Sequence, residues 1–283
     1  MATVELSAGH IDYVDVGDGP TVVFTHGPPM NHELWRKVVP LMGGYRCVLP
    51  TLPLGGHRQP MRADADLSHR GQARLLGEFC EALDLTDVTL VLNDWGGGQF
   101  LLLEPSGQRV GRLVLVACEA FDNFPPPPAR MMATLVRAPA GAWLFSRLMQ
   151  LRPIRRARFS YGGMSLTPLP DDMVRRWFAP MAENRLIRRD FAKFAPSAPD
   201  RATLLQWSEE LRSCPVPVLV AWADRDRLMP RDHGRRLADH YPNARLLEVS
   251  DSATLIPEDQ PVVLATALQQ FLTATGAAPF AGR

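Results

Sequence analysis

Lysine and cysteine are scarce in this chain of 283 residues. Its 31 basic residues include only two lysines, Lys37 and Lys193. The four cysteines lie far apart and form no CxxC pair, so the sequence predicts buried free thiols and neither a zinc site nor a redox-active dithiol. The glycines show no GxGxxG spacing of the kind that binds nucleotides. We therefore expect no metal and no cofactor.

Long apolar runs and a strong net charge are absent as well. No stretch approaches the roughly 20 apolar residues that span a bilayer, and the N-terminus lacks the basic segment and apolar run of a signal peptide. The formal net charge of +1 gives no overall attraction to nucleic acid. We expect a cytoplasmic protein that binds neither membranes nor nucleic acid, and the composition leaves its oligomeric state open.

Short apolar segments alternate with helical ones along most of the chain. The continuous apolar runs at 88–92 and 113–117 are typical of buried parallel strands, and residues 68–83 have apolar side chains at helical spacing. Further strands are expected at 4–6, 10–16, 21–25, 46–49, 216–222 and 244–249, and a closing helix at 262–272. Strands that alternate with helices indicate right-handed crossovers, so the sequence predicts an α/β class with a mostly parallel, doubly wound sheet.

Residues 125–212 interrupt this alternation. They begin with a run of prolines, contain no expected sheet strand and hold four helical segments, at 131–136, 142–151, 173–181 and 185–194. We therefore expect a core formed by 1–124 and 213–283, with a helical cap, 125–212, inserted over the carboxyl edge of the sheet. The cap has 15 Lys and Arg against 7 Asp and Glu. Its arginines are interpreted either as solvated helix faces or as a mouth that attracts an anionic substrate or an acidic partner.

One strand ends in a polar residue and a glycine-rich turn. The apolar run that begins at Val88 leads into Asn93-Asp94-Trp95, and residues 96–98 are all glycine. A strand, a polar residue, a sharp turn and a helix are the layout of a nucleophile elbow, in which glycine lets the backbone bend tightly. The alternative is that Asp94 only caps the following helix. The layout makes Asp94 the first candidate for a catalytic residue.

Five features in a fixed order resemble a known family. They are HGPP at 26–29, NDWGG at 93–97, the helical insertion, WADRD at 222–226 and ATLIPEDQP at 253–261. With this order and spacing the chain resembles the α/β-hydrolase superfamily, in the branch of haloalkane dehalogenases and epoxide hydrolases. The resemblance covers nearly the whole chain and implies an α/β-hydrolase fold with an inserted helical cap.

The resemblance implies roles for residues near the elbow. In those enzymes an aspartate at the elbow attacks carbon and forms an ester with the substrate, and Asp94 matches it. Trp95 matches the tryptophan whose indole N–H holds the leaving halide. The acid that orients a histidine matches Asp226 or Glu119, with Asp224 as a third choice. For each of these carboxylates the alternative is an ordinary loop or cap contact.

The histidine of the family pattern is missing. Its position holds Thr254, and no histidine follows His240. Threonine cannot act as a general base near neutral pH, so an ester formed at Asp94 would not be hydrolysed by the family's route. His57 and His26 are the candidates for a substitute base, and the alternative for His26 is a structural hydrogen bond in its loop.

Two further departures concern the substrate's surroundings. The residue that follows His-Gly gives the oxyanion hole one of its backbone N–H groups, and here it is Pro28, which has none. Losing one such donor costs about 10²–10³ in rate, so acyl transfer is disfavoured. Epoxide hydrolases use paired cap tyrosines, whereas the insertion has only Tyr161. We expect His26, Pro28 and Tyr161, with Trp95, to border the substrate.

Three hypotheses about function follow. The first is a hydrolase-like enzyme that acts on a small organic substrate through Asp94 as nucleophile or base, with a non-hydrolytic lyase, isomerase or cyclase as its variant. The second, motivated by Thr254 and Pro28, is a ligand-binding homologue without catalytic activity. The third, with the least support, is a module that binds other proteins through the basic insertion.

Overall fold

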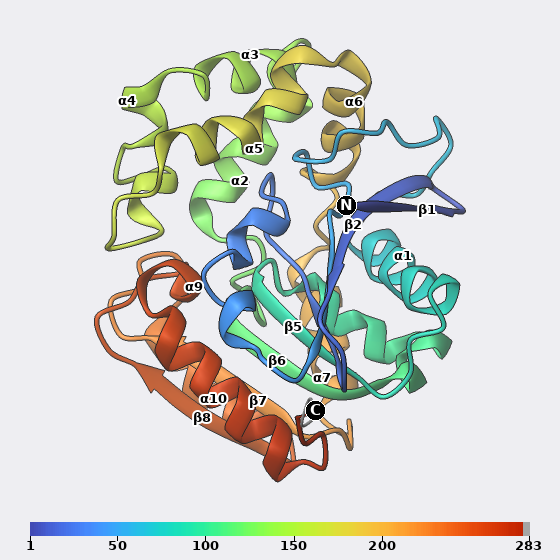
Figure 1. Cartoon of the computed structure of the whole chain (residues 1–283). Coiled ribbons are helices and arrows are strands. Elements are labelled where there is room, and N and C mark those ends of the chain that lie inside the picture. Colours follow the sequence, from blue (N-terminus) through green and yellow to red (C-terminus); the bar gives the residue numbers. More distant parts are fainter. Residues whose placement is uncertain (280–283) are drawn as a thin grey trace.

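An eight-stranded sheet forms the centre of the chain in the computed structural model, which describes residues 1–279 (Figure 1). The strand order is β1-β2-β4-β3-β5-β6-β7-β8. The β1–β2 and β2–β4 pairs are antiparallel, and the other neighbouring pairs are parallel. The strands are β1 (Ala2–Leu6), β2 (Gly9–Val16), β3 (Thr21–Phe24), β4 (Arg46–Pro50), β5 (Val88–Asp94), β6 (Val110–Cys118), β7 (Val218–Ala223) and β8 (Ala244–Val249). The predicted fold class is confirmed.

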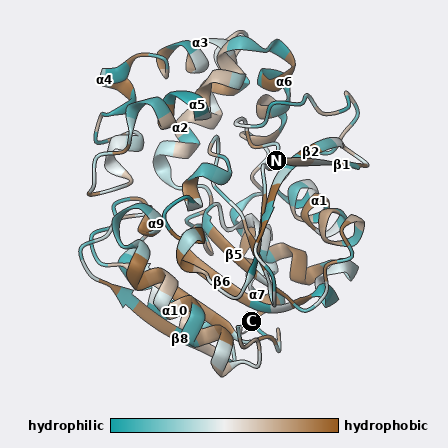
Figure 2. Cartoon of the chain, viewed as in Figure 1, coloured by the Kyte–Doolittle hydropathy of each residue, from teal (hydrophilic) through white to brown (hydrophobic). Residues whose placement is uncertain are grey.

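The central strands are buried along their whole length because helices cover both faces of a parallel sheet. Every residue of β5 and β7 is buried, and all of β6 except Gly111. Figure 2 shows these strands as the brown, apolar centre of the molecule. The only strongly polar side chains of β5, Asn93 and Asp94, stand at its carboxyl end. A buried apolar strand thus delivers two polar groups to one edge of the sheet.

Helices and 3-10 turns of the core flank the sheet. They are η1 (His32–Trp35), η2 (Val39–Leu41), α1 (His69–Ala82), η3 (Gly96–Leu103), η4 (Pro105–Arg109), α7 (Arg201–Leu211), α8 (Arg231–His240), α9 (Ile256–Asp259) and α10 (Pro261–Ala274). Ser68 caps α1, since its side chain accepts a hydrogen bond from Gly71 N–H. α1 and α7 contact η3, and α8 contacts β7 and β8.

A group of helices lies above the carboxyl ends of β5 and β6, in the upper part of Figure 1. It consists of α2 (Pro127–Arg137), α3 (Gly141–Leu148), α4 (Arg152–Arg155), η5 (Tyr161–Gly163), α5 (Asp171–Glu183) and α6 (Arg185–Phe194). α3 contacts α2, α5 and α6, and Trp177, Phe178 and Phe191 are buried between them. The helical character expected at 131–136, 142–151, 173–181 and 185–194 is found at these places. α7 instead packs on the core, where Trp207 contacts Phe100.

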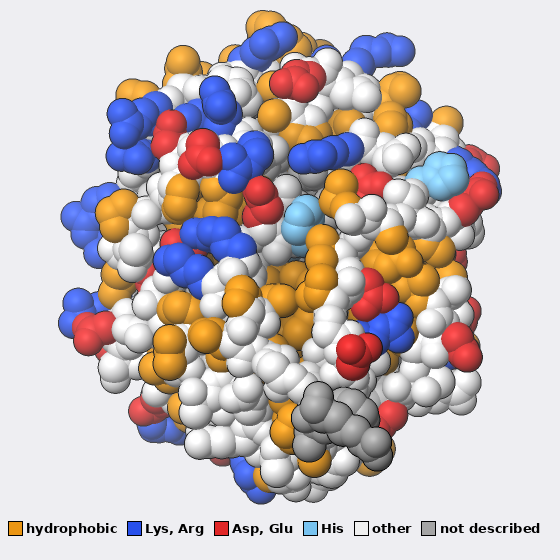
Figure 3. Space-filling view, viewed as in Figure 1, with side chains coloured by type: hydrophobic (Ala, Val, Ile, Leu, Met, Phe, Trp, Pro, Cys, Tyr) orange, Lys and Arg blue, Asp and Glu red, His pale blue; other side chains and the backbone are white. Residues whose placement is uncertain are grey.

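Charge and cysteine follow simple patterns in the structure. Lys and Arg gather over the upper helices in Figure 3. The four cysteines are free; Cys47, Cys80 and Cys118 are buried and Cys214 is half-buried. Within residues 1–279 no helix is long and apolar enough to cross a membrane.

Candidate functional site

Asp94 sits at a sharp turn between β5 and η3. Its φ of 64° lies in the left-handed region, which non-glycine residues enter rarely and which aspartate tolerates better than most. The N–H of Trp95 donates to the carbonyl of Asn93 at 2.8 Å and closes a three-residue turn. A Cβ on Gly27 would lie 1.8 Å from Asp94 Oδ2, so only glycine fits beside the carboxyl group. The side chain of Asp94 is not a helix cap, because Trp95 is the cap residue of η3.

The carboxyl group of Asp94 lies in an apolar environment. The residue is 8% exposed. Burial, and then the charge of Asp226, raise its pKa from 3.8 to about 8, and no hydrogen bond acts in the opposite direction. Within residues 1–279 no hydrogen-bond donor reaches this side chain, so burial disfavours the carboxylate form. Asp94 is therefore a carboxyl group that gains and loses its proton near neutral pH.

The two acids predicted to partner the elbow both lie close to it. The backbone N–H of Glu119 donates to the carbonyl of Asp94 at 2.9 Å. The Glu119 side chain is buried, and its Oε2 has no hydrogen-bond partner among residues 1–279. Burial, and then the charge of Asp94, hold the pKa of Glu119 well above its ordinary value. Its position beside Asp94 therefore favours the protonated form of the Glu119 carboxyl group.

Asp226 is held by three donors. Its Oδ1 accepts from the backbone N–H groups of Leu228 (2.8 Å) and Met229 (3.0 Å) and from Thr254 Oγ1 at 2.9 Å. Its Oδ2 is buried and has no hydrogen-bond partner in the described part of the chain. Burial raises the pKa of Asp226 above its usual range, and the hydrogen bonds oppose this rise. The acid after β7 is thus bonded to a hydroxyl group rather than to an imidazole.

Asn93 joins the elbow to the loop that holds Thr254. Its Nδ2 donates to the carbonyls of Val116 and Thr254, both at 2.8 Å. The sequence interpretation gave Asn93 no role. The amide side chain of Asn93 in an otherwise apolar strand could have indicated such a role, because a buried amide requires hydrogen-bond partners.

The two histidines considered as substitute bases are engaged elsewhere. His26 Nδ1 bonds the carbonyl of Gly27 at 3.0 Å and Nε2 accepts from Leu52 N–H at 3.0 Å, and burial lowers its pKa to about 4. His57 Nε2 bonds Asp190 Oδ2 of α6 at 3.3 Å, and burial lowers its pKa despite this partner. Both are neutral loop residues, and the structure brings neither to the cavity described below.

Trp95 also points away from that cavity. Its indole N–H donates to His69 Nδ1 at 3.1 Å, and the ring is fully buried against Phe194. The structure does not place this N–H where a leaving group could reach it. His69, at the start of α1, had no assigned role in the sequence.

A cavity of about 340 Å³ opens above Asp94. It lies between the carboxyl ends of the strands and the upper helices, and most of its wall is apolar. Pro28 and Tyr161 line this cavity, and the Tyr161 hydroxyl donates to the carbonyl of Pro28 at 2.5 Å. Its lining is Pro28, Asp94, Glu119, Pro126, Pro128, Ala129, Met132, Phe145, Met149, Arg158, Phe159, Ser160, Tyr161, Gly163, Met164, Arg227 and Leu228. In volume and lining it fits a small ligand site.

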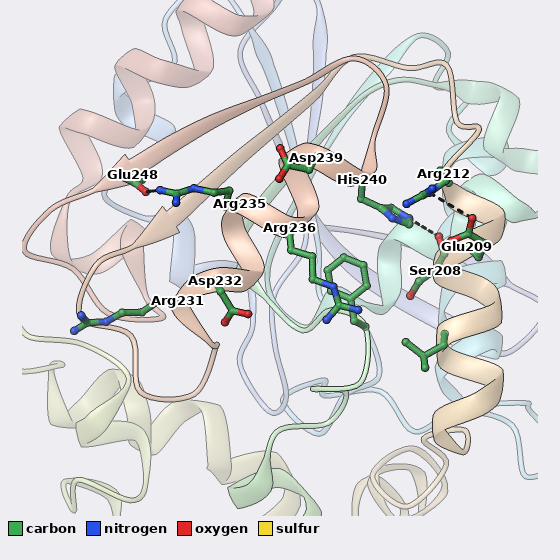
Figure 4. A pocket seen from close by; sticks show the side chains of 12 residues that line it. Ser208, Glu209, Arg212, Arg231, Asp232, Arg235, Arg236, Asp239, His240 and Glu248 are labelled. Atoms are coloured by element: carbon green, nitrogen blue, oxygen red, sulfur yellow. Dashed lines mark hydrogen bonds and ion pairs between the residues drawn. The ribbon is translucent and has the colours of Figure 1, made fainter.

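A larger hollow of about 720 Å³ lies elsewhere, between α7 and α8 (Figure 4). Its lining contains none of the elbow residues. Arginines and carboxylates alternate in it, and Arg212 pairs with Glu209 and Arg235 with Glu248. This hollow is an open, charge-balanced surface groove, so the cavity above Asp94 is the candidate active site. Across residues 1–279 no group of three or more His, Cys, Asp or Glu is placed to hold a metal ion.

Comparison with known proteins gives a family that agrees with this geometry. A sequence model of the alpha/beta hydrolase family matches residues 22–267. A haloalkane dehalogenase of Mesorhizobium japonicum is 36% identical over 137 residues, which is 46% of this chain and 44% of that protein. A 2-hydroxy-6-oxononadienedioate/2-hydroxy-6-oxononatrienedioate hydrolase of Cupriavidus pinatubonensis is 31% identical over 82% of this chain and 80% of its own length.

Solved structures share the fold. A putative ancestral haloalkane dehalogenase, AncHLD2, superposes with a TM-score of 0.79 at 22% identity and covers 98% of this chain and 100% of its own. The haloalkane dehalogenase DatA of Agrobacterium tumefaciens gives 0.77 at 22% identity, with 97% of both chains covered. The chain therefore belongs to the alpha/beta hydrolase family and is an enzyme of that fold related to haloalkane dehalogenases and to 2-hydroxy-6-oxononadienedioate hydrolases.

Proposed function

We propose that this enzyme acts on a small, largely apolar organic substrate, with Asp94 as a general base that removes a proton from carbon. The observation that carries the proposal is the state of the Asp94 carboxyl group, which is buried without a donor and has its pKa raised to about 8. A base works best when its pKa lies near the ambient pH. Accepting a proton also converts a poorly solvated carboxylate into a neutral acid, which the apolar cavity favours.

Glu119, the second carboxyl group that lines the cavity, supports the same chemistry. Removal of a proton next to a carbonyl group places negative charge on the carbonyl oxygen. A carboxylic acid that stays neutral at pH 7 can donate a hydrogen bond to that oxygen, and Glu119 has a raised pKa and an unpartnered Oε2. In this proposal the Glu119 carboxyl group replaces the backbone oxyanion hole. Of the two N–H groups that would form that hole, Pro28 lacks one, and the backbone N–H of Trp95 is already bonded to the carbonyl of Asn93.

The substrate class is therefore a carbonyl compound with a C–H bond next to the carbonyl group. Asp94 removes this proton, the electron pair moves onto the carbonyl oxygen, and the proton returns to carbon or a leaving group departs. The outcome is an isomerisation or an elimination. In this proposal helices α2 to α6 act as a cap that excludes water from the intermediate. Thr254 stands where a hydrolytic relative would hold its histidine.

A second candidate function is alkylation of Asp94 with loss of halide. The position of Asp94 at the elbow and the dehalogenase relatives favour it. With its pKa at about 8, roughly one tenth of Asp94 is ionised at pH 7 and able to attack carbon. Thr254, bonded to Asp226, offers no base to activate water, so the ester would accumulate.

Deuterium exchange separates the two candidates. The enzyme is incubated in deuterated buffer with a panel of enolisable ketones, and exchange of the C–H next to the carbonyl is followed by proton NMR. The same protein is incubated with bromoalkanes and epoxides and its intact mass is measured. Catalysed exchange that D94N abolishes, and that has an apparent pKa near 8, supports the proposal. An adduct on Asp94 without exchange favours alkylation, whereas repeated release of halide or diol would refute both versions.

A further inference from the structure

Two arginines border the mouth of the cavity above Asp94. Arg158 belongs to the segment between α4 and η5, and Arg227 to the loop after β7. They come from two parts of the fold, Arg158 from among the upper helices and Arg227 from a loop of the core. Both side chains belong to exposed residues. The open end of an apolar cavity thus carries two positive charges.

Neither arginine has a protein partner in the part of the chain that the structure describes. Their neighbours in sequence differ in this respect, since Arg155 pairs with Asp171 at 2.9 Å and Arg225 pairs with Asp251 at 2.6 Å. Several arginines of residues 125–212 form ion pairs away from the cavity, whereas the two guanidinium groups that border it form none within residues 1–279.

The rest of the cavity has the opposite character. Met132, Phe145 and Met149 contribute apolar wall, and the carboxyl groups of Asp94 and Glu119 lie on the floor. A ligand that matches the carboxyl groups, the apolar wall and the two arginines has a reactive end near Asp94, an apolar body and an anionic group at the other end. A volume of about 340 Å³ limits this ligand to a small molecule.

We propose that the substrate is an amphiphilic organic anion, with a carboxylate or sulfonate group held by Arg158 and Arg227 and an apolar body that extends to Asp94. The planar guanidinium group binds such anions through paired N–H donors, and two of them at exposed residues of the lining fix which end of the molecule faces Asp94. The inference rests on the proposed function only in taking this cavity as the substrate site.

The groove between α7 and α8 is the alternative place where an anion could bind, because Arg231, Arg235 and Arg236 also lie there (Figure 4). Most of its arginines are compensated, as Arg235 pairs with Glu248 and Arg236 lies over the Phe121 ring and within 3.7 Å of Asp122. Arg231 has no ion pair within residues 1–279 and is therefore a matched control for the two arginines at the cavity mouth.

The test uses two fluorescent probes of similar shape, 1-anilinonaphthalene-8-sulfonate and the neutral N-phenyl-1-naphthylamine. We expect the wild-type protein to bind both. Arg158→Gln and Arg227→Gln each weaken sulfonate binding about fivefold, and the double variant weakens it about 25-fold, whereas the affinity for the neutral probe stays within twofold. Arg231→Gln leaves both affinities unchanged, and 0.5 M salt weakens only sulfonate binding.

Several results would overturn the inference. If Arg158→Gln and Arg227→Gln weaken the affinity for both probes equally, the arginines only shape the mouth of the cavity. A loss in Arg231→Gln would place the anion between α7 and α8, and no sulfonate binding to the wild type would exclude an anion site at the mouth. Asp94→Asn should bind both probes, so the result is independent of whether Asp94 acts as the base.

Discussion

Replacing Asp94 by asparagine is expected to make the protein more stable at alkaline pH and to leave its stability at acid pH nearly unchanged. The native state keeps the proton of Asp94 up to about pH 8, whereas an unfolded chain releases it near pH 4. Between these values the native state binds one proton more than the unfolded state. The free energy of unfolding of the wild type therefore falls as pH rises.

The size of this effect follows from the two pKa values. A pKa that rises from 3.8 to about 8 corresponds to a loss of about 5–6 kcal/mol between pH 4 and pH 9, of which about 4 kcal/mol is lost by pH 7. This is a large part of the 5–15 kcal/mol that stabilises a typical domain. Asparagine has nearly the same shape and no charge, so it avoids the cost of burying a carboxylate.

Urea unfolding followed by circular dichroism at pH 4.5, 6, 7.5 and 9 measures the difference directly. The difference between the variant and the wild type cancels the contributions of most other titrating groups. Asp64→Asn, at an exposed residue, is the matched control and should change the free energy of unfolding only slightly. A difference for Asp94→Asn that is independent of pH, or a variant less stable than the wild type at pH 9, would refute the assignment of a buried carboxyl group with a raised pKa.

Three further predictions concern neighbours of the site. Gly27→Ala places a Cβ 1.8 Å from Asp94 Oδ2, so it should displace the carboxyl group and lower the free energy of unfolding by about 1–3 kcal/mol. An unchanged urea unfolding curve would contradict the close approach of Gly27 and Asp94. Thr254→Val removes the donor to Asp226 and should cost about 1–2 kcal/mol at pH 7, a loss that Thr254→Ser should mostly restore. Asp190→Asn weakens the buried contacts of Asp190 with His57, Met61 N–H and Arg189 and should lower the free energy of unfolding by about 3 kcal/mol. The loss is measured as a drop in the thermal midpoint, and no drop would mean that these contacts of Asp190 are not formed.

The strands and the elbow were predictable because their signals are local. Apolar runs bounded by polar or glycine residues identified the buried strands, and their parallel pairing follows from the helices between them. Asp94 stood out for the same reason, as a polar residue that ends an apolar strand before three glycines. The resemblance to one family added Asp226 and Glu119, and the structure brings both to the elbow.

The partners of side chains across the fold were not predictable. Nothing near Trp95 in sequence indicates that His69 accepts its indole proton. The bond between His57 and Asp190 joins residues 133 positions apart, although Asp190 is the only acid between Arg185 and Lys193. Arg158 and Arg227 were hidden among many arginines, because only the positions of the carboxylates show which guanidinium groups remain unpaired.

The contact between His57 and Asp190 has a consequence for the timing of ligand exchange. It is buried, with 3% and 0% of the two side chains exposed, and it fastens α6 to the loop after β4. Lifting the upper helices as a lid would break this contact and the other bonds of Asp190, and such motions take microseconds to milliseconds. Molecules that pass the mouth need only rotation of exposed side chains such as Phe159, which is 76% exposed and rotates within nanoseconds. The rate at which ligands enter and leave should therefore be limited by the width of the cavity mouth rather than by a slow movement of the upper helices.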